Sequence, residues 1–312
     1  MKNVAIAIHG GAGTLLKENM SSDMEQSYSA ALDLALSSGH RVLAEGGSAL
    51  TAVEEAVKQL EDSPLFNAGK GSVFTSEGTH EMDASIMEGE NLLAGAVSMV
   101  RGVKNPVSLA RLIMEKSGHV FLAGEGAAAF ARQMNCVFEP DEYFYDELRF
   151  KQWQHVKGTD QVKLDHSALD EKKFGTVGAV ALDASGNLAA ATSTGGMTNK
   201  KFGRVGDSPM IGAGNYANNS TCAVSCTGSG EFFIRGVVAY DVSCLIEYKG
   251  LSLKAAADEV IHQRLKKIGG DGGLIAVDCQ GNITMPFNTD GMYRASLNSK
   301  GEKLVAIYNQ SY

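Results

Sequence analysis

The sequence predicts an α+β protein in which helices cover β-sheets, and three observations lead to this class. Segments with helical periodicity alternate with short apolar runs of strand length. Several of these runs are apolar on both faces, as expected for strands that lie between a second sheet and a helix layer. A pattern of strand, tight turn and strand also occurs twice. Together these features favour sheets covered by helices over an all-α or all-β fold.

The expected elements follow one another along the whole chain. Helical periodicity is strong in segments bounded by Gly, Ser, Asn or Pro signals: residues 22–44, 48–60, 106–116, 125–134, 231–248 and 253–268. Apolar segments of strand length are residues 4–8, 81–88, 94–100, 177–183, 188–193, 222–226, 274–278, 283–287 and 304–308. The 312 residues, 44% of them hydrophobic, are enough for one large domain or two ordinary ones.

One repeated pattern predicts two hairpins. The stretches "GTVGAVALDASGNLAAATS", from Gly175, and "GGLIAVDCQGNITMPFN", from Gly272, both contain a strand, an aspartate, two residues, Gly-Asn and a second strand. The Gly-Asn pair suits the positive φ of a tight turn. Ahead of the first hairpin, residues 155–173 form the most polar and least periodic segment, which predicts an exposed, mobile linker. This linker ends directly at Gly175 and Thr176.

Composition and charge disfavour several classes of function. The formal net charge of −8 disfavours nucleic-acid binding, which needs clustered Lys and Arg. No apolar run reaches membrane-spanning length, and the run in "MKNVAIAIHG" ends without a cleavage site, so we expect a buried first strand rather than a signal peptide. The five cysteines lie in apolar surroundings, which predicts reduced, buried thiols in a cytoplasmic protein. Cys222 and Cys226 alternate onto one strand face without histidine partners, which disfavours a metal site.

Several familiar site motifs are incomplete or absent. Residues 9–13, "HGGAG", are similar to the glycine-rich oxyanion loops of hydrolases, although such a turn after a first strand is more often a close backbone approach. Residues 67–72, "NAGKGS", fail as a phosphate loop because glycine follows Lys70 and the upstream glycine is missing. The chain has no Gly-x-Ser-x-Gly elbow, and its seven histidines lack metal-ligand spacing. A Ser-His-Asp or zinc hydrolase is therefore not supported.

Three hydroxyl groups stand at glycine-flanked strand ends: Thr176 in "GTVG", Thr194 in "TSTGG" and Thr227 in "CTGSG". A threonine in a strand is usually a β-branched filler, but three such ends on strands that can be neighbours suggest a site. An N-terminal threonine can act as a nucleophile with its own α-amine as base, because that amine titrates near pH ~8. Thr176 is internal, so this chemistry requires cleavage of the Gly175–Thr176 bond, which the exposed linker can accommodate.

At these residues the chain resembles the plant-type L-asparaginase and isoaspartyl peptidase family of N-terminal nucleophile hydrolases. The resemblance covers essentially the whole chain and follows the family's order of motifs. The matching stretches are "HGGAGT" from His9, "FNAGKGSVFT" from Phe66, "HEMDASIMEG" from His80, "GTVGAVALD" from Gly175, "STGG" from Ser193, "GRVGDSPMIGAGNYA" from Gly203 and "CTGSGE" from Cys226.

The resemblance implies a single four-layer αββα domain that cleaves itself from an inactive precursor. The fragments would be residues 1–175, an α subunit that ends in the linker, and residues 176–312, a β subunit. They would stay together as an αβ unit and dimerise to (αβ)2. The activity implied is hydrolysis of β-aspartyl dipeptides and L-asparagine through a β-aspartyl ester on Thr176, without a catalytic cofactor.

The resemblance also assigns the remaining site residues. Arg204 would bind the substrate α-carboxylate and Asp207 its α-ammonium, although spacing alone fits a surface ion pair better. Oxyanion-hole donors would be the Thr227 hydroxyl and the Gly228 N–H, and one such donor is typically worth about 100-fold or more in rate. The other roles implied are a backbone contact from Gly230, orientation of the nucleophile by Thr194, and support of the site wall or of the self-cleavage oxyanion by Asn67.

The same resemblance implies a structural sodium ion held by backbone carbonyl groups. The carbonyls would belong to Leu60, Glu61, Ser63, Phe66, Ala68 and Lys70. Carbonyl oxygens are suitable hard ligands. Lys70 departs from the family pattern, which commonly has an apolar residue there, and its charge can point away from the ion.

Two alternatives to this interpretation stay open. A glycosylasparaginase of the same superfamily uses the same nucleophile, but Phe174-Gly175 and the expected absence of a signal peptide argue against it. An uncleaved, non-catalytic binding protein is the alternative from another class. We expect β-aspartyl dipeptides to be better substrates than L-asparagine.

Overall fold

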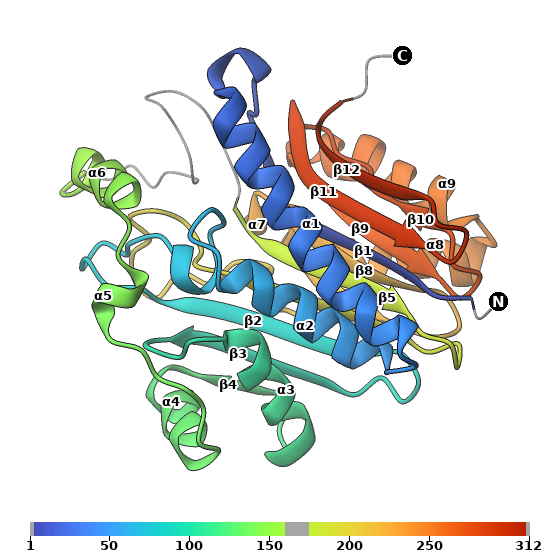
Figure 1. Cartoon of the computed structure of the whole chain (residues 1–312), viewed down its shortest axis with the longest axis horizontal. Helices are drawn as coiled ribbons and strands as arrows, with labels where there is room; N and C mark the ends of the chain where they lie inside the picture. Colours follow the sequence, from blue (N-terminus) through green and yellow to red (C-terminus); the bar gives the residue numbers. More distant parts are fainter. Residues whose placement is uncertain (1–2, 160–174, 310–312) are drawn as a thin grey trace.

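The computed structural model describes residues 3–159 and 175–309, and in this part of the chain the strands form two sheets (Figure 1). The larger sheet has the strand order β12-β11-β1-β5-β6-β2-β3-β4, and the smaller has the order β10-β9-β8-β7. The strands of the larger sheet are β1 (Ala5–Gly13), β2 (Met82–Glu88), β3 (Ala94–Val100), β4 (Phe121–Ala123), β5 (Val177–Leu182), β6 (Leu188–Thr194), β11 (Gly291–Asn298) and β12 (Lys303–Tyr308). Those of the smaller sheet are β7 (Asn215–Ala217), β8 (Cys222–Gly228), β9 (Gly272–Asp278) and β10 (Ile283–Thr284).

Helices cover the outer face of each sheet, and the inner faces of the two sheets pack together (Figure 1). The larger sheet is covered by α1 (Ser22–Ala44), α2 (Ala49–Glu61) and α3 (Pro106–Lys116). The smaller sheet packs against α7 (Gly230–Gly236), α8 (Val238–Lys249), α9 (Leu253–Glu259) and the π-helical segment η3 (Val260–Leu265). Peripheral elements are η1 (Lys17–Asn19), η2 (Gly69–Gly71), α4 (Gly124–Gln133), α5 (Asp141–Phe144) and α6 (Glu147–Val156). The layer order is αββα, so the predicted fold class is confirmed.

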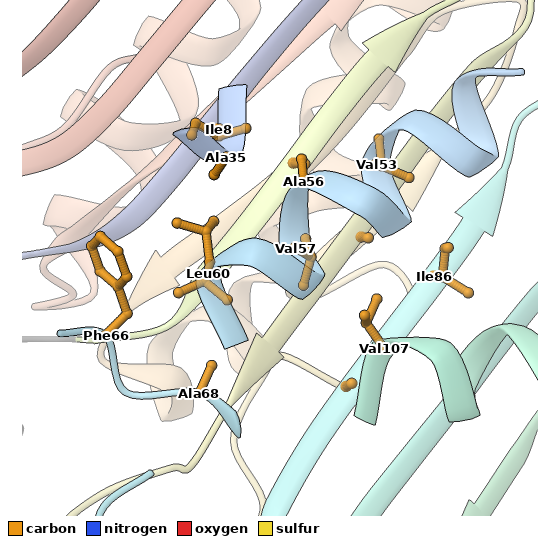
Figure 2. Close-up of a cluster of buried hydrophobic side chains, with 14 of the residues drawn as sticks. Ile8, Ala35, Val53, Ala56, Val57, Leu60, Phe66, Ala68, Ile86 and Val107 are labelled. Carbon is orange, nitrogen blue, oxygen red and sulfur yellow. The ribbon is translucent and has the colours of Figure 1, made fainter. Parts of the chain in front are cut away.

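The period of two along each strand divides its side chains between two buried layers. In β5, Val177, Ala179 and Ala181 belong to the core beneath the helices, whereas Val180 and Leu182 belong to the core between the sheets. Figure 2 shows the helix-side core, where residues of α2 such as Val53 and Leu60 lie close to the larger sheet. The inter-sheet core is rich in alanine, and small side chains allow the sheets to approach closely.

Most predicted elements are present, and the differences have local causes. The segment 22–44 is α1 and 94–100 is β3, both with the expected bounds. The helix predicted at 231–248 is broken at Val237, which adopts left-handed φ and ψ of 48° and 46° and separates α7 from α8. The segment 253–268 continues from α9 into η3 rather than forming one α-helix. The strand predicted at 283–287 is reduced to Ile283–Thr284.

Three strands are not predicted from the pattern. The strands β4 and β7 have three residues each, which is too short to show a period of two. The eight residues of β11, "GMYRASLN", include a buried arginine and serine, so their sequence does not read as an apolar run. This strand nevertheless pairs with both β1 and β12, and its position is fixed by those neighbours.

Both predicted hairpins are confirmed, and their turns have the same side-chain hydrogen bonds. In the β5–β6 turn, Asp183 Oδ1 accepts the N–H groups of residues 185 and 187, and Gly186 has a φ of 89°. In the β9–β10 turn, Asp278 Oδ1 accepts the N–H groups of residues 280 and 282, and Gly281 has a φ of 80°. A third turn, between β11 and β12, has the same arrangement with Asn298 in place of aspartate. It is the same type of turn, and the sequence pattern missed it because asparagine replaces aspartate and Gly301-Glu302 replaces the Gly-Asn pair.

Three sequence expectations need correction. Residues 9–13 are not a loop, because β1 continues through Gly13 with a bulge between His9 and Gly11. The predicted linker starts too early, since His155 and Val156 belong to α6 and Val156 is buried; its part from 160 to 174 lies outside the described residues. Cys279 is exposed, so not all of the cysteines are buried. No helix in the described ranges is long and apolar enough to cross a bilayer.

Candidate active site

The candidate active site lies where β5, β6 and β8 meet at one end of the layer between the sheets. Thr176 directly precedes β5, Thr194 ends β6, and Thr227 lies near the end of β8 in the facing sheet. In β5 and β6, the pleat that places Val180 and Ala190 in the inter-sheet core directs Thr176 and Thr194 toward the same layer. The described residues that line the adjacent pocket are Gly175, Thr176, Thr194, Gly196, Met197, Arg204, Gly206, Asp207, Ser208 and Gly228.

Among the described residues, the hydroxyl of Thr176 contacts the hydroxyl of Thr194. Its Oγ1 donates a hydrogen bond to Thr194 Oγ1 over 3.1 Å, and Thr194 Oγ1 also accepts the N–H of Gly196 over 3.0 Å. Thr176 is only 8% exposed, so few alternative positions are open to its side chain. The hydrogen of the Thr176 hydroxyl is thereby directed at Thr194, and the oxygen lone pairs remain available for attack on a carbonyl carbon.

The carbonyl group of Gly175 is held by the backbone of Asn67. The Asn67 N–H donates to Gly175 O over 3.1 Å. The Asn67 side chain donates to Gly196 O over 2.7 Å and accepts the N–H of Val73 over 3.1 Å. A Cβ on Gly195 would lie 2.4 Å from Asn67 Oδ1, so this close approach requires glycine. Asn67 thus connects the Gly175–Thr176 bond to the turn that follows Thr194.

Arg204 and Asp207 lie on the other side of the pocket. Arg204 forms a two-point ion pair with Glu231, from Nε to Oε1 over 2.8 Å and from Nη2 to Oε2 over 3.0 Å. Asp207 is 4% exposed; burial raises the pKa of its carboxyl group to about 7, while the Arg204 guanidinium acts in the opposite direction. A Cβ on Gly230 would lie 2.9 Å from Asp207 Oδ1 and 3.0 Å from Arg204 Nη2. Glycine at 230 therefore leaves both polar groups accessible from the pocket.

Two buried polar atoms on this side have no hydrogen-bond partner among the described residues. They are Asp207 Oδ2 and Thr227 Oγ1, and Thr227 is completely buried. An unpaired buried polar atom costs about 1–3 kcal/mol, so such atoms are uncommon and suggest a missing ligand. Gly228 lines the pocket directly, whereas the side chain of Thr227 lies behind the described lining.

Three further residues near the site were not identified as site residues from the sequence. Glu231 pairs with Arg204, and its place directly after Gly230 in the first turn of α7 was the available signal. Lys200 is 2% exposed and donates to Glu81 O over 2.7 Å, and a Cβ on Gly196 would lie 2.9 Å from its Nζ. His9 contacts the carbonyl of Thr176 over 3.0 Å. No local pattern points to Lys200, and the glycine-rich stretch from His9 did not reveal the contact with Thr176, because the partners of both residues are distant in sequence.

In the loop expected to hold sodium, two of the expected carbonyl groups lie close to glycines. A Cβ on Gly69 would lie 2.4 Å from Glu61 O, and one on Gly71 would lie 2.1 Å from Phe66 O. Backbone carbonyl oxygens are suitable hard ligands for an alkali cation, so this loop is a candidate site for one. The Lys70 side chain points elsewhere, since its Nζ lies 5.1 Å from the centre of the Tyr143 ring. The lysine charge therefore lies over the Tyr143 ring of α5.

The αββα layers and the threonine at the start of a central strand define the class of N-terminal nucleophile hydrolases, and comparisons with known proteins narrow this class. A family model described as asparaginase matches residues 2–307. The chain is 55% identical over 300 residues to an isoaspartyl peptidase of Escherichia coli, covering 95% of this chain and 93% of that protein. It is 44% identical over 294 residues to the human isoaspartyl peptidase/L-asparaginase, covering 93% and 92%. The chain belongs to the asparaginase family.

A second eukaryotic relative matches a similar share of the chain. The putative isoaspartyl peptidase/L-asparaginase of Dictyostelium discoideum is 46% identical over 323 residues, which cover 94% of this chain and 93% of that protein. The family model, which spans residues 2–307, includes β1, the Asn67 loop and every candidate site residue. The family assignment therefore applies to the whole fold rather than to one motif.

Proposed function

We propose that this protein is an isoaspartyl peptidase and L-asparaginase that activates itself by cleaving the Gly175–Thr176 bond. The relatives named above support the activity, because they match nearly the full length of the chain. Self-cleavage is supported by two hydrogen bonds at the Gly175–Thr176 bond. The Asn67 N–H donates to the Gly175 carbonyl, and the adjacent Thr176 hydroxyl is oriented by its bond to Thr194. A carbonyl polarised by a donor and an adjacent nucleophile are the two requirements of acyl transfer.

Self-cleavage begins when Thr176 Oγ attacks the carbonyl carbon of Gly175. Formation of the C–O bond gives a tetrahedral oxyanion, and its collapse breaks the C–N bond as the hydroxyl proton moves to the released nitrogen. Water then hydrolyses the resulting ester, which gives a carboxylate on Gly175 and a free α-amine on Thr176. Asn67 stabilises the oxyanion through its backbone N–H, and the products are residues 1–175 and 176–312. Glycine at 175 leaves its carbonyl uncrowded.

Turnover repeats the same chemistry on a substrate. Thr176 Oγ attacks the side-chain carbonyl of a β-aspartyl group, and the α-amine of Thr176 accepts the proton. Ammonia or an amino acid leaves, and water releases aspartate from the ester. The Thr227 hydroxyl and the Gly228 N–H stabilise the oxyanion, and the unpaired state of Thr227 Oγ1 supports this role.

Substrate binding uses the opposite side of the pocket. Arg204 binds the α-carboxylate, Asp207 binds the α-ammonium, and Gly230 provides the backbone contact between them. With Gly175 in place, the pocket has a volume of about 20 Å3, enough for a single water molecule. Movement of Gly175 away from the pocket is therefore needed to admit a substrate. β-Aspartyl dipeptides are the preferred substrates.

Assembly, location and ion binding complete the proposal. Two αβ units form an (αβ)2 dimer, and the protein acts in the cytoplasm, where its unpaired cysteines remain reduced. A sodium ion bound by the carbonyl groups of residues 60, 61, 63, 66, 68 and 70 stabilises the loop that contains Asn67. Replacing sodium with a large organic cation in the buffer should lower the melting temperature, because a ligand bound only to the native state stabilises it.

Gel electrophoresis and N-terminal sequencing test the proposal directly. The purified protein should give two fragments, and the smaller should begin Thr-Val-Gly-Ala. Thr176→Ala should block both cleavage and turnover, and Thr176→Ser should retain some of each. Higher kcat/KM for β-Asp-Leu than for L-Asn is expected. An intact chain of 32.9 kDa with no hydrolysis after long incubation would indicate a binding protein. Hydrolysis of only N-acetylglucosaminyl-asparagine would indicate a glycosylasparaginase.

A further inference from the structure

A buried hydrogen-bond network crosses from the smaller sheet to the backbone of Thr176. His9, on β1, is completely buried between the sheets. Its Nδ1 lies 3.0 Å from the carbonyl oxygen of Thr176, and its Nε2 lies 2.9 Å from Ser225 Oγ on β8. Ser225 Oγ lies 2.7 Å from Thr192 Oγ1 on β6, which also contacts Gly214 O over 3.1 Å. The network therefore joins three strands and ends on the nucleophilic residue.

The partners determine where each hydrogen lies. A carbonyl oxygen only accepts, so His9 Nδ1 carries the hydrogen and donates to Thr176. Burial lowers the pKa of the imidazole to about 3, which keeps the ring neutral and leaves Nε2 as an acceptor. Ser225 therefore donates to Nε2, and Thr192 donates its single hydroxyl hydrogen to Gly214 O. Every polar hydrogen in this network therefore has a defined acceptor, and the tautomer of His9 with its hydrogen on Nδ1 is the one that satisfies the network.

The second glycine of the "GTVG" stretch provides the space for this network. A Cβ on Gly178 would lie 2.0 Å from Ser225 Oγ and 2.5 Å from His9 Nε2. Any side chain at 178 would therefore displace the histidine or the serine. This explains a glycine in the interior of a strand, where glycine has no side chain to pack and weakens the structure.

We propose that His9 is a positioning residue that holds Thr176, the nucleophile, in its reactive position after self-cleavage. This inference rests on the proposed function. Cleavage removes the covalent bond between Gly175 and Thr176, so Thr176 becomes a chain end whose own nitrogen is then a base. The bond from His9 Nδ1–H fixes the Thr176 carbonyl, and with it the position from which Oγ and the α-amine project. Without it, the contact with Thr194 and the start of β5 are what hold the residue among the part of the chain that the structure describes.

The test compares two substitutions that each keep one end of the imidazole. His9→Asn places an amide N–H near the Nδ1 position and keeps the donor to Thr176, whereas His9→Gln places its amide near Nε2 and keeps only the partner of Ser225. We expect His9→Gln to lower kcat by about 10- to 100-fold with KM changed by less than about twofold, because Arg204 and Asp207 are untouched. His9→Asn should keep kcat within about fivefold of the unsubstituted protein.

Two measurements separate positioning from simple loss of stability. Activity is expressed per cleaved protomer, counted by N-terminal sequencing, so slow maturation does not count as slow turnover. Melting temperatures should fall by similar amounts in both variants, because each loses one buried hydrogen bond, and Ser225→Ala should match them while keeping kcat near that of His9→Asn.

Three outcomes decide the matter. Equal losses of kcat in His9→Asn and His9→Gln, parallel to their melting temperatures, would show a packing role only and overturn the inference. Unchanged kcat in His9→Gln would also overturn it. If the unsubstituted protein neither cleaves itself nor hydrolyses β-Asp-Leu, the proposed function fails first, and this result is distinct from the other two.

Discussion

The two sides of the candidate site differ in how completely their polar groups are paired. We call Thr176, Thr194, Asn67 and His9 the nucleophile side, and there the reacting hydroxyl, the Gly175 carbonyl and the imidazole all have hydrogen-bond partners.

We call Arg204, Asp207, Thr227 and Gly230 the substrate side. There Asp207 Oδ2 and Thr227 Oγ1 are buried and have no partner among the described residues. The difference indicates that the nucleophile side fixes the positions of the reacting groups, whereas the substrate side has polar groups free to bind a ligand. Pre-paired groups lose little freedom during reaction, whereas unpaired groups gain most when the substrate supplies the missing contacts.

The largest effect is expected at two threonines, of which Thr194 has hydrogen-bond partners for its hydroxyl and Thr227 has none among the described residues. Thr227→Val should lower kcat by about 100-fold, because it removes an oxyanion donor, yet it should leave the melting temperature equal or higher, because an unpaired buried hydroxyl disappears. Thr194→Val is the control on the nucleophile side. It leaves the Gly196 N–H without its acceptor and should lower both activity and melting temperature. A drop of several degrees in Thr227→Val would show that its hydroxyl is paired after all.

The second prediction concerns pH and the substrate side. Burial raises the pKa of Asp207 to about 7, so in the free enzyme its carboxylate is present above that pH and is lost as the pH falls. The α-amine of Thr176 must also be unprotonated and titrates near pH ~8. The logarithm of kcat/KM should therefore rise with a slope of about 2 below pH 7, whereas kcat should rise with a slope of about 1.

The lower slope for kcat follows from the substrate itself. A bound α-ammonium favours the carboxylate form of Asp207 and lowers its pKa in the complex. Steady-state kinetics with β-Asp-Leu between pH 5 and 9 measures the pH profiles of both kcat/KM and kcat. A slope of 1 in both profiles would mean that Asp207 is already ionised in the free enzyme, contrary to the effect of its burial.

A smaller effect is expected at Glu231. Its two hydrogen bonds fix the orientation of the Arg204 guanidinium while Nη1 stays beside Gly206 at the pocket. Glu231→Ala should raise KM for β-Asp-Leu by about three- to tenfold, the scale of one hydrogen bond, and leave kcat nearly unchanged. Glu231→Gln, which keeps part of the pairing, should give an intermediate KM. A lower KM in Glu231→Ala would mean that the glutamate competes with the substrate carboxylate.

The smallest effect is expected at Lys70, which lies on neither side of the site. Its Nζ packs against the Tyr143 ring, an interaction worth about 0.5–1 kcal/mol at an exposed position. Lys70→Met should therefore change kcat and KM by less than about twofold and the free energy of unfolding by no more than about 1 kcal/mol. Urea unfolding and kinetics measure both. A loss of the sodium dependence of the melting temperature in this variant would place the lysine at the ion instead.

Periodicity and turn chemistry were enough to locate α1, β3 and both predicted hairpins, because these features depend on residues close together in the chain. The glycine-flanked threonines likewise identified the region of the site. The same reasoning failed for β7 and β11, which lack an apolar run or sufficient length and are placed by their neighbours. It also placed residues 9–13 in a loop, since a run of glycines looks the same in a turn and in a bulged strand.

The sequence by itself predicted the αββα class, which the structure confirms, and it provided the candidate Gly175–Thr176 junction and the set of polar residues available for chemistry. Only the tertiary structure decided how they pair. His9 reaches Thr176 and Ser225 across the space between two sheets, and the Asn67 N–H meets the Gly175 carbonyl from a separate loop. A local pattern records which face of a strand is buried. It does not record which residue of another strand or loop lies opposite, because that depends on how the sheets stack.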